Sequence, residues 1–217
     1  MSEIAYAVRR SDRARRVRVS VDPVSGVEVV LPRRAAAREA AAAVRELAPW
    51  IERRMRVLEQ ARAELGASAG EAAYLGERLA LVPEPGRTRV RRRAGELLIP
   101  AGDHRPALER WYRRRARAEV ATRLDRACAL AGTSYSGLTI RAQRTRWASC
   151  SPSGAMSFNW RLLLAPAAVL DSVVWHEVCH LEIADHSPRF WALLEQRCPD
   201  HRRQQRWLRR YGALLNL

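Results

Sequence analysis

Three histidines near the C-terminal end of the chain constrain its fold more than any other feature. His176 and His180 enclose Glu177 in the pattern H-E-x-x-H, and His186 follows after five further residues. Residues four apart lie on one face of a helix, so the first two imidazoles can reach one ion. Neutral imidazoles suit Zn²⁺, and a catalytic zinc takes three protein ligands and keeps one position open. The spacing therefore predicts one zinc ion per chain on His176, His180 and His186.

The surroundings of His186 favour it as the third ligand. Ser187 and Pro188 are typical of a helix start, so a ligand in front of them is held between two fixed elements. Glu182 follows the H-E-x-x-H segment too closely and points elsewhere on the helix. Asp185 is more suited to accept a hydrogen bond from an imidazole N–H than to bind the metal. Two other histidines occur in charged, loop-like contexts and are not expected to bind metal: His104 and His201.

Length and composition narrow the class of protein. The 217 residues are 47% apolar, enough for one large core, and no stretch reaches the about 18 apolar residues of a membrane span. The N-terminal residues show no secretory pattern. The four cysteines form no C-x-x-C pair, so we expect reduced thiols, a cytoplasmic location and no membrane association. Cys179, between the two helical histidines, is expected to be a buried thiol.

The net charge of +16 comes from 39 basic and 23 acidic residues, and every basic residue is Arg. Arginine pairs well with phosphate, so one interpretation is a nucleic-acid partner. The arginines are spread along the whole chain, however, and codon bias explains the excess slightly better. We therefore expect weak nucleic-acid binding through the basic surface, centred on the dense stretch 89–93 and largely lost near physiological salt.

The first half of the sequence reads as strands and two helices. Residues 15–31 alternate between apolar and polar positions around a turn of Asp, Pro, Ser and Gly, which predicts a β-hairpin. Residues 34–65 have helical spacing, and Pro49 divides them because it suits the first turn of a new helix. Residues 73–99 return to short strands.

The second half is richer in helices. Residues 105–131 show a long apolar stripe that predicts one helix ended by Gly132. Residues 138–164 read as two strands, and Pro166 opens the helix that carries the metal ligands. Two more helices are expected near the C-terminus. The fold class is therefore α+β, with a strand-rich region over residues 1–103 and a chemical core over residues 104–217.

The predicted site suits amide hydrolysis. Zinc lowers the pKa of a water molecule towards ~7 and polarises a carbonyl group. Glu177 can then take a proton from the metal-activated water and pass one to the leaving amine, as general base and general acid. We expect a protein or peptide substrate, bound as an added strand along an exposed edge at 144–149 or 155–161. Three side chains there are candidates for stabilising the oxyanion or binding a carboxylate, with structural hydrogen bonding equally expected: Arg146, Asn159 and Arg161.

Several motifs together resemble one family. They are residues 146–151 (RWASCS), 158–162 (FNWRL), 173–181 (VVWHEVCHL), 186–191 (HSPRFW) and 198–200 (CPD). Their order and spacing resemble the YgjP-like metallopeptidases, relatives of the SprT-type zinc proteases, over about residues 13–210. The resemblance implies a zincin-like metallopeptidase core, zinc on the three histidines and Glu177 as the catalytic acid/base.

Two other functions compete with a zinc metallopeptidase. A nucleic-acid-associated SprT-like protease would use the arginines to find its substrates. A metal-dependent nucleotide phosphohydrolase would tolerate the arginines, but such sites favour carboxylate-held Mg²⁺ over three imidazoles. The ranking is therefore peptidase, nucleic-acid-linked protease, phosphohydrolase.

Overall fold

The computed structural model describes residues 4–66, 69–143 and 145–217. It divides into two compact units, Met1–Ala67 and Ser68–Leu217. The sequence places the division near residue 103, so the boundary lies earlier than expected. The reason is that strands from 71 onward supply core residues to the second unit: Leu97 and Ile99 belong to the same buried cluster as Tyr112 of the long helix.

The first unit is a small sheet covered by two helices. The expected hairpin is present, and an additional strand, β1, pairs in parallel with its second strand. Its core consists of Val27, Val29 and Leu31 against Val44 and Ile51 of the helices. Pro49 lies in the first turn of the second helix, as expected. The elements are β1 (Tyr6–Ser11), β2 (Arg18–Asp22), β3 (Gly26–Pro32), α1 (Arg38–Glu46) and α2 (Ala48–Leu65).

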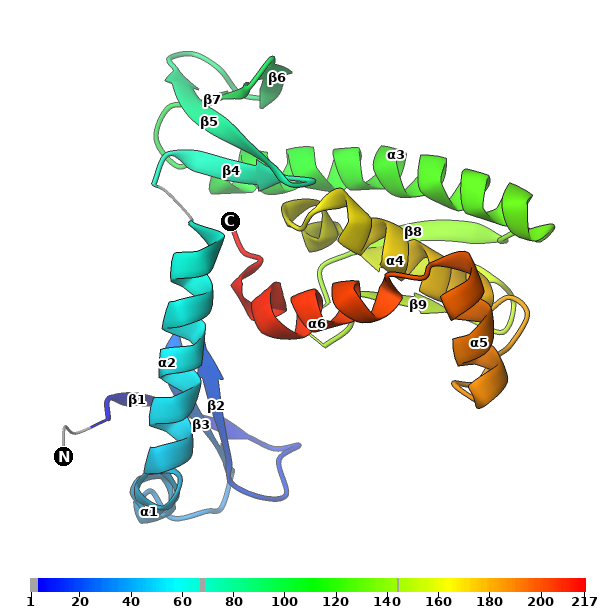
Figure 1. Ribbon diagram of the computed structural model, residues 1–217. Coiled ribbons are helices and arrows are strands. Elements are labelled where there is room, and N and C mark those ends of the chain that lie inside the picture. The colour runs from blue at the N-terminus through cyan, green and yellow to red at the C-terminus, as the bar shows by residue number, and fades with distance from the viewer. Residues whose placement is uncertain (1–3, 67–68, 144) are drawn as a thin grey trace. The chain divides into compact units, whose positions relative to one another are not determined.

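The second unit has two sheets and a group of helices (Figure 1). One sheet has the order β4-β5-β7-β6, and the other has the order β8-β10-β9. The strands are β4 (Glu71–Tyr74), β5 (Glu77–Glu84), β6 (Arg91–Arg93), β7 (Glu96–Pro100), β8 (Gly137–Arg141), β9 (Ala148–Cys150) and β10 (Ala155–Asn159). The helices are α3 (Arg105–Ala131), η1 (Trp160–Leu164), α4 (Ala167–Cys179), α5 (Pro188–Arg197), α6 (His201–Tyr211) and η2 (Gly212–Leu214).

The long helix α3 has the predicted limits, and Gly132 ends it in the left-handed conformation, with φ of 67°. The stretch 138–164 differs from its prediction of two strands. It contributes to three, and residues 160–164 form the short helix η1, which buries Trp160 and Leu162. Among the described residues, no helix combines the length and apolarity of a membrane span.

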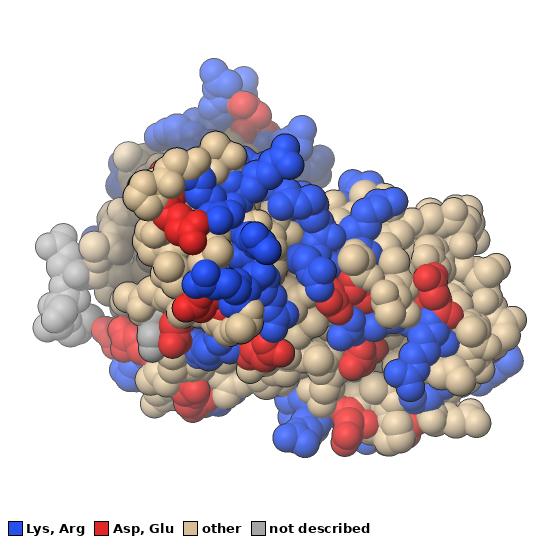
Figure 2. Space-filling view, turned by 90° about the horizontal axis from the view of Figure 1, so that it is seen from above, with Lys and Arg blue, Asp and Glu red and all other residues tan. Residues whose placement is uncertain are grey.

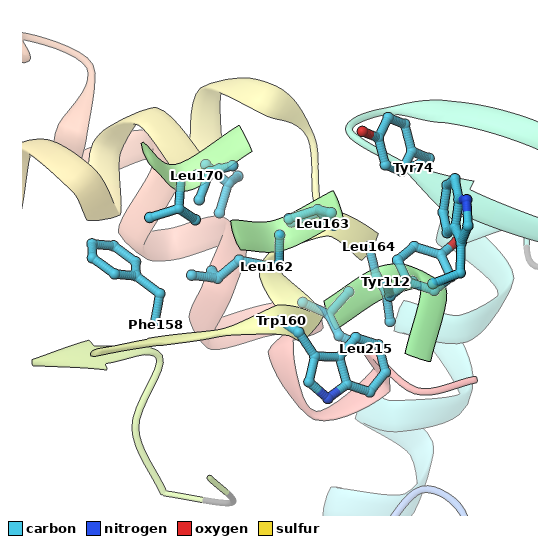
Figure 3. Close-up of a cluster of buried hydrophobic side chains, with 14 of the residues drawn as sticks. Tyr74, Tyr112, Phe158, Trp160, Leu162, Leu163, Leu164, Leu170 and Leu215 are labelled. Carbon is cyan, nitrogen blue, oxygen red and sulfur yellow. The ribbon is translucent and has the colours of Figure 1, made fainter. Parts of the chain in front are cut away.

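The core of the second unit lies where α3, η1 and α4 meet (Figure 3). Tyr112 of α3 is fully buried and its ring lies 5.7 Å from that of Trp160, while Phe158 and Leu170 pack on the other side of η1. Each such aromatic ring removes a large apolar area from water, which is the main stabilising term. This core supports α4 and therefore the positions of its C-terminal residues.

The turn between β4 and β5 contacts the N-terminus of α4. Leu75 has φ of 52°, an uncommon conformation for a residue with a side chain. Its N–H donates to the carbonyl of Leu163 at 2.7 Å, and its carbonyl accepts from the N–H of Ala167 at 3.3 Å. Ala167 is the first residue of α4, whose N–H lacks a partner within the helix. The turn thus supplies a hydrogen-bond acceptor for an N–H at the start of α4 that has no partner within the helix.

Candidate metal centre and catalytic carboxylate

The three predicted histidines converge. His176 and Glu177 lie in the last turn of α4, and His180 is the residue at which that helix ends. A turn closed by the N–H of Ile183 on the carbonyl of Cys179, at 3.0 Å, reverses the chain. His186 therefore returns to the other two: one ring nitrogen of each histidine lies within 4.8 Å of the others, and Nε2 of His176 and His186 are 3.0 Å apart.

Neighbouring groups fix the orientation of these rings. Nδ1 of His180 donates to the carbonyl of Ile183 at 3.1 Å when it carries the proton, which leaves Nε2 as the lone-pair nitrogen. Phe190 of α5 is fully buried and lies 4.5 to 4.9 Å from all three rings, stacked on that of His180. An apolar wall behind the imidazoles and a backbone acceptor on one of them are typical supports of metal ligands.

Burial keeps the imidazoles of His176 and His180 neutral. It lowers the pKa of His176 to about 4, with smaller contributions from His180 and His186. Burial also lowers the pKa of His180, although the hydrogen bond to the carbonyl of Ile183 raises it in part. Neutral imidazole is the form that binds a metal ion.

Glu177 is buried beside this cluster and is 5% exposed. Burial raises its pKa to about 7, and a hydrogen bond from the backbone of Cys150 opposes the shift. A carboxyl group with a pKa near neutrality can both accept and release a proton at physiological pH. Because Cys150 lies in β9, the same contact ties the carboxylate to the strand that borders the site.

Two cavities meet at Glu177. One, of about 330 Å³, extends past His180 and His186 along β9. The other, of about 250 Å³, extends towards α6 between Trp147 and Leu208. The two share the lining residues Arg146, Ala148, His176 and Glu177, so they adjoin each other at the carboxylate.

The order β8-β10-β9 decides which strand has a free edge. β10 is central, so the expectation that 155–161 supplies the edge is wrong. Among the described residues, β9 pairs only with β10, and it lines the larger cavity through Ser149 and Cys150, in agreement with the alternative at 144–149. Residue 144 itself lies outside the described residues.

The other acidic, cysteine and histidine side chains considered from the sequence lie outside the three-histidine cluster. Glu182 forms an ion pair with Arg197 at 2.6 Å, away from the imidazoles, and Cys179 is a buried thiol, both as expected. Asp185 accepts the N–H of Ser187 at 3.0 Å, and so orders the start of α5 where a hydrogen bond to an imidazole was expected. His201 is not in a loop-like context: it is 2% exposed, begins α6 and contacts Glu195 at 2.7 Å. His104 contacts the carbonyl of Gly102.

Among the three proposed stabilisers, only Arg146 lines the cavities. Asn159 is buried: its Nδ2 donates to the carbonyls of Gln143, at 2.7 Å, and Arg146, at 3.4 Å. Its Oδ1 accepts the N–H of Arg161 at 3.1 Å. The guanidinium of Arg161 lies over the Trp160 ring. Asn159 therefore holds the segment that carries Arg146 and does not face substrate.

Replacing Asn159 with Ala should destabilise the protein and loosen Arg146. The change leaves partly buried backbone groups without partners, which costs about 1–3 kcal/mol of unfolding free energy. We expect a lower midpoint in urea and a reduced kcat/KM on peptides. Asn216→Ala is the matched control, because it removes an exposed amide bonded to one carbonyl. Equal destabilisation by the two variants would contradict this role of Asn159.

Four residues that border the site were not predicted from the sequence: Phe190, Trp147 and the α6 residues Gln204 and Leu208. Phe190 carried a usable signal, since it lies four residues beyond His186 at the start of a predicted helix. The contribution of α6 depends on tertiary packing and leaves no local pattern.

An α+β unit in which three imidazoles converge beside a buried carboxylate describes a metal-dependent hydrolase. The family model of the YgjP-like metallopeptidase domain matches residues 15–211, and the chain belongs to this family. It is therefore a metal-dependent peptidase, and the resemblance seen in the motifs is confirmed. No curated protein matches the chain. Among solved structures, the crystal structure of the metallopeptidase zymogen of Pyrococcus abyssi abylysin is similar, with 24% identity, a TM-score of 0.36 and coverage of 42% of this chain and 96% of that chain.

Proposed function

We propose that this protein is a zinc peptidase with a zincin-like core, in which His176, His180 and His186 hold one zinc ion and Glu177 is the general acid/base. The observation that carries the proposal is the convergence of three imidazole nitrogens within 4.8 Å beside a buried carboxylate. Two ligands on a tetrahedral zinc ion, each at about 2.1 Å, lie about 3.4 Å apart. The 3.0 Å separation of Nε2 in His176 and His186 is close to this value.

The all-nitrogen donor set also fits zinc. Carboxylate and water ligands suit magnesium, whereas imidazole suits zinc and its transition-metal neighbours. Within the described part of the chain, these histidines are the one group of three side chains spaced to hold an ion. This is the argument against the phosphohydrolase alternative, which would need acidic ligands.

Zinc, when bound, supplies a Lewis acid that acidifies water and polarises the scissile carbonyl. The chain's own residues do the rest. Glu177, with a pKa near 7, takes the proton of the attacking water and later gives a proton to the leaving amine. Arg146, exposed at the junction of the two cavities, is the cation placed to meet a substrate carbonyl or carboxylate.

The substrate we propose is an extended peptide bound along β9. The free edge of this strand can pair with a peptide backbone, and the hydrogen bonds of such an added strand are independent of sequence. Side chains would then enter the two cavities. A library of peptides tests this function: new amino termini must appear with the zinc-loaded protein and not with Glu177→Gln. Their absence would remove the peptidase proposal.

The smaller cavity is expected to select substrates by side-chain size. Its walls include Trp147, Val173 and Leu208, which favour an apolar group. A methyl group at Gly212 would lie 2.8 Å from Cζ2 of Trp147, so this glycine permits the ring to pack closely. Its own φ of −56° is one that any residue adopts.

Gly212→Ala should therefore narrow the cavity by displacing Trp147. We expect kcat/KM to fall about tenfold for peptides with a large apolar residue next to the scissile bond, and little for those with Ala there. The measurement is competitive cleavage of peptides that differ at this one position. Gly137→Ala is the control, because a methyl group there contacts nothing within 4 Å. An equal loss on all peptides would show that Trp147 does not select the substrate.

We also propose a cytoplasmic location, supported by four cysteines that are all unpaired.

A nucleic-acid-linked protease is the second candidate function. It is supported by a separate cavity lined by four arginines, which is described in the next subsection.

A further inference from the structure

A third cavity, of about 580 Å³, lies between β6 and α3. Four arginines line it, Arg91 and Arg92 from the strand and Arg114 and Arg115 from the helix, around an apolar floor that includes Trp111. We call this the basic pocket. It shares no lining residue with the two cavities at Glu177, so it is a separate site.

Two of the four arginines are held by neighbouring side chains. Arg92 pairs with Glu77, and its guanidinium lies 5.0 Å from the centre of the Tyr74 ring. Arg115 donates to the hydroxyl of Tyr74 at 3.2 Å and to Glu119 at 3.0 Å. These contacts fix the walls of the basic pocket and neutralise part of its charge.

The other two arginines have their charge available. Arg91 and Arg114 are exposed and form no ion pair or side-chain hydrogen bond with the residues that the structure describes. Two guanidinium groups with ten N–H donors between them thus border one cavity without acidic partners. In a pocket with an apolar floor, such groups attract an anion more strongly than on an open surface.

The positive charge continues beyond the pocket. Arg110 lies four residues before Arg114 on the same face of α3, about 6 Å along the helix axis, and is also exposed. Figure 2 looks down on the face where β6 and α3 lie in Figure 1, and basic side chains gather there. A cavity of this volume with a further cation beside it fits a polymer of phosphates better than a single phosphate ion.

We propose that the basic pocket binds the sugar–phosphate backbone of a nucleic acid, with Arg91 and Arg114 contacting phosphates. A guanidinium group binds two oxygens of one phosphate at the same time. It can bind a carboxylate in the same way, so the preference for phosphate over an acidic peptide comes from geometry and charge density. Binding through these contacts should be independent of base sequence, because contacts to phosphates carry no direct sequence information. This inference goes beyond the proposed peptidase function and does not depend on it.

The test is fluorescence anisotropy of the full-length protein with a labelled single-stranded oligonucleotide and its duplex at several salt concentrations. Arg91→Ala with Arg114→Ala should weaken binding at low salt at least tenfold. For the single strand it should reduce the slope of log K against log salt by about 1.4, since each lost phosphate contact removes about 0.7. For the duplex the corresponding reduction is about 1.8.

Arg203→Ala with Arg206→Ala is the matched control, because it removes the same charge from exposed positions of α6. We expect it to change affinity less than about threefold through the general field. Both variants should keep the circular dichroism spectrum and thermal unfolding midpoint of the unchanged protein, which shows that they are folded. Equal weakening by the two pairs would overturn the proposal in favour of diffuse charge. Tighter binding of heparin than of either oligonucleotide, lost in the same Arg91 and Arg114 variant, would assign the pocket to a different polyanion and also overturn it.

Discussion

Glu177→Gln should abolish peptide hydrolysis while the protein keeps its zinc. Gln is close in size to Glu and can fill the same buried position, but it cannot accept the proton of water. General acid–base catalysis contributes about 10²–10⁴-fold, and Glu177 is proposed to act in two proton transfers, so we expect kcat/KM to fall at least about 1000-fold. The measurements are hydrolysis of a fluorogenic peptide and metal content by elemental analysis of the same sample.

Glu182→Gln is the control for this substitution. Glu182 lies close in sequence but pairs with Arg197 and belongs neither to the histidine cluster nor to the lining of the two cavities, so its loss should change activity little. If Glu177→Gln instead loses zinc in parallel with activity, then Glu177 is a ligand and the proposed division of roles is wrong.

His176→Ala combined with His180→Ala should reduce zinc from about one ion per chain to background and eliminate hydrolysis. A single remaining imidazole, His186, cannot hold the ion against dilution, since affinity comes from ligands acting together. The fold should persist, because α4 is anchored by Val174, Val178 and Leu170 in the core of the second unit. Circular dichroism checks the fold, and elemental analysis after dialysis checks the metal.

His104→Ala controls for the general loss of histidine. His104 precedes α3 and contacts the carbonyl of Gly102, so the variant should keep its zinc and its activity. Stoichiometric zinc in the double variant would show that the ion is bound elsewhere, and the three-histidine proposal would fail.

The parts of this structure that were predictable depend on short-range chemistry. The spacing of His176 and His180 is a property of one helix turn, and the limits of α3 follow from its apolar stripe and from Gly132. The hairpin of β2 and β3 follows from alternation around a turn. In each case, the residues that determine the outcome lie within one element or one turn of each other.

The parts that were missed depend on partners far away in the sequence. Nothing near β10 indicates that β8 joins it in parallel and so removes it from the edge of the sheet. The assignment of β4–β7 to the second unit depends on packing against α3, and the role of Trp147 depends on its contact with Gly212. These contacts leave no periodic signal in the segments that make them.

The partners of the arginines also depend on contacts between distant parts of the sequence. The sequence stretch 89–93 looks like a uniform cluster of cations, and in the fold its members differ. Arg92 pairs with Glu77 and Arg93 with Glu96, whereas Arg91 faces the basic pocket beside Arg114. A count of arginines therefore overestimates the charge available to a partner and does not locate it.

The hydrogen bonds of Leu75 have a consequence for newly made protein. The turn that supports the start of α4 is synthesised long before that helix, and its hydrogen bonds to Leu163 and Ala167 join segments far apart in the chain. Such distant contacts form late in folding because a long loop must close first. The imidazoles and Glu177 therefore reach their working positions only after most of the second unit has folded. A peptidase built in this way does not cut its own chain intramolecularly before it has folded, because the active site and the cleavable, extended backbone do not coexist in one molecule.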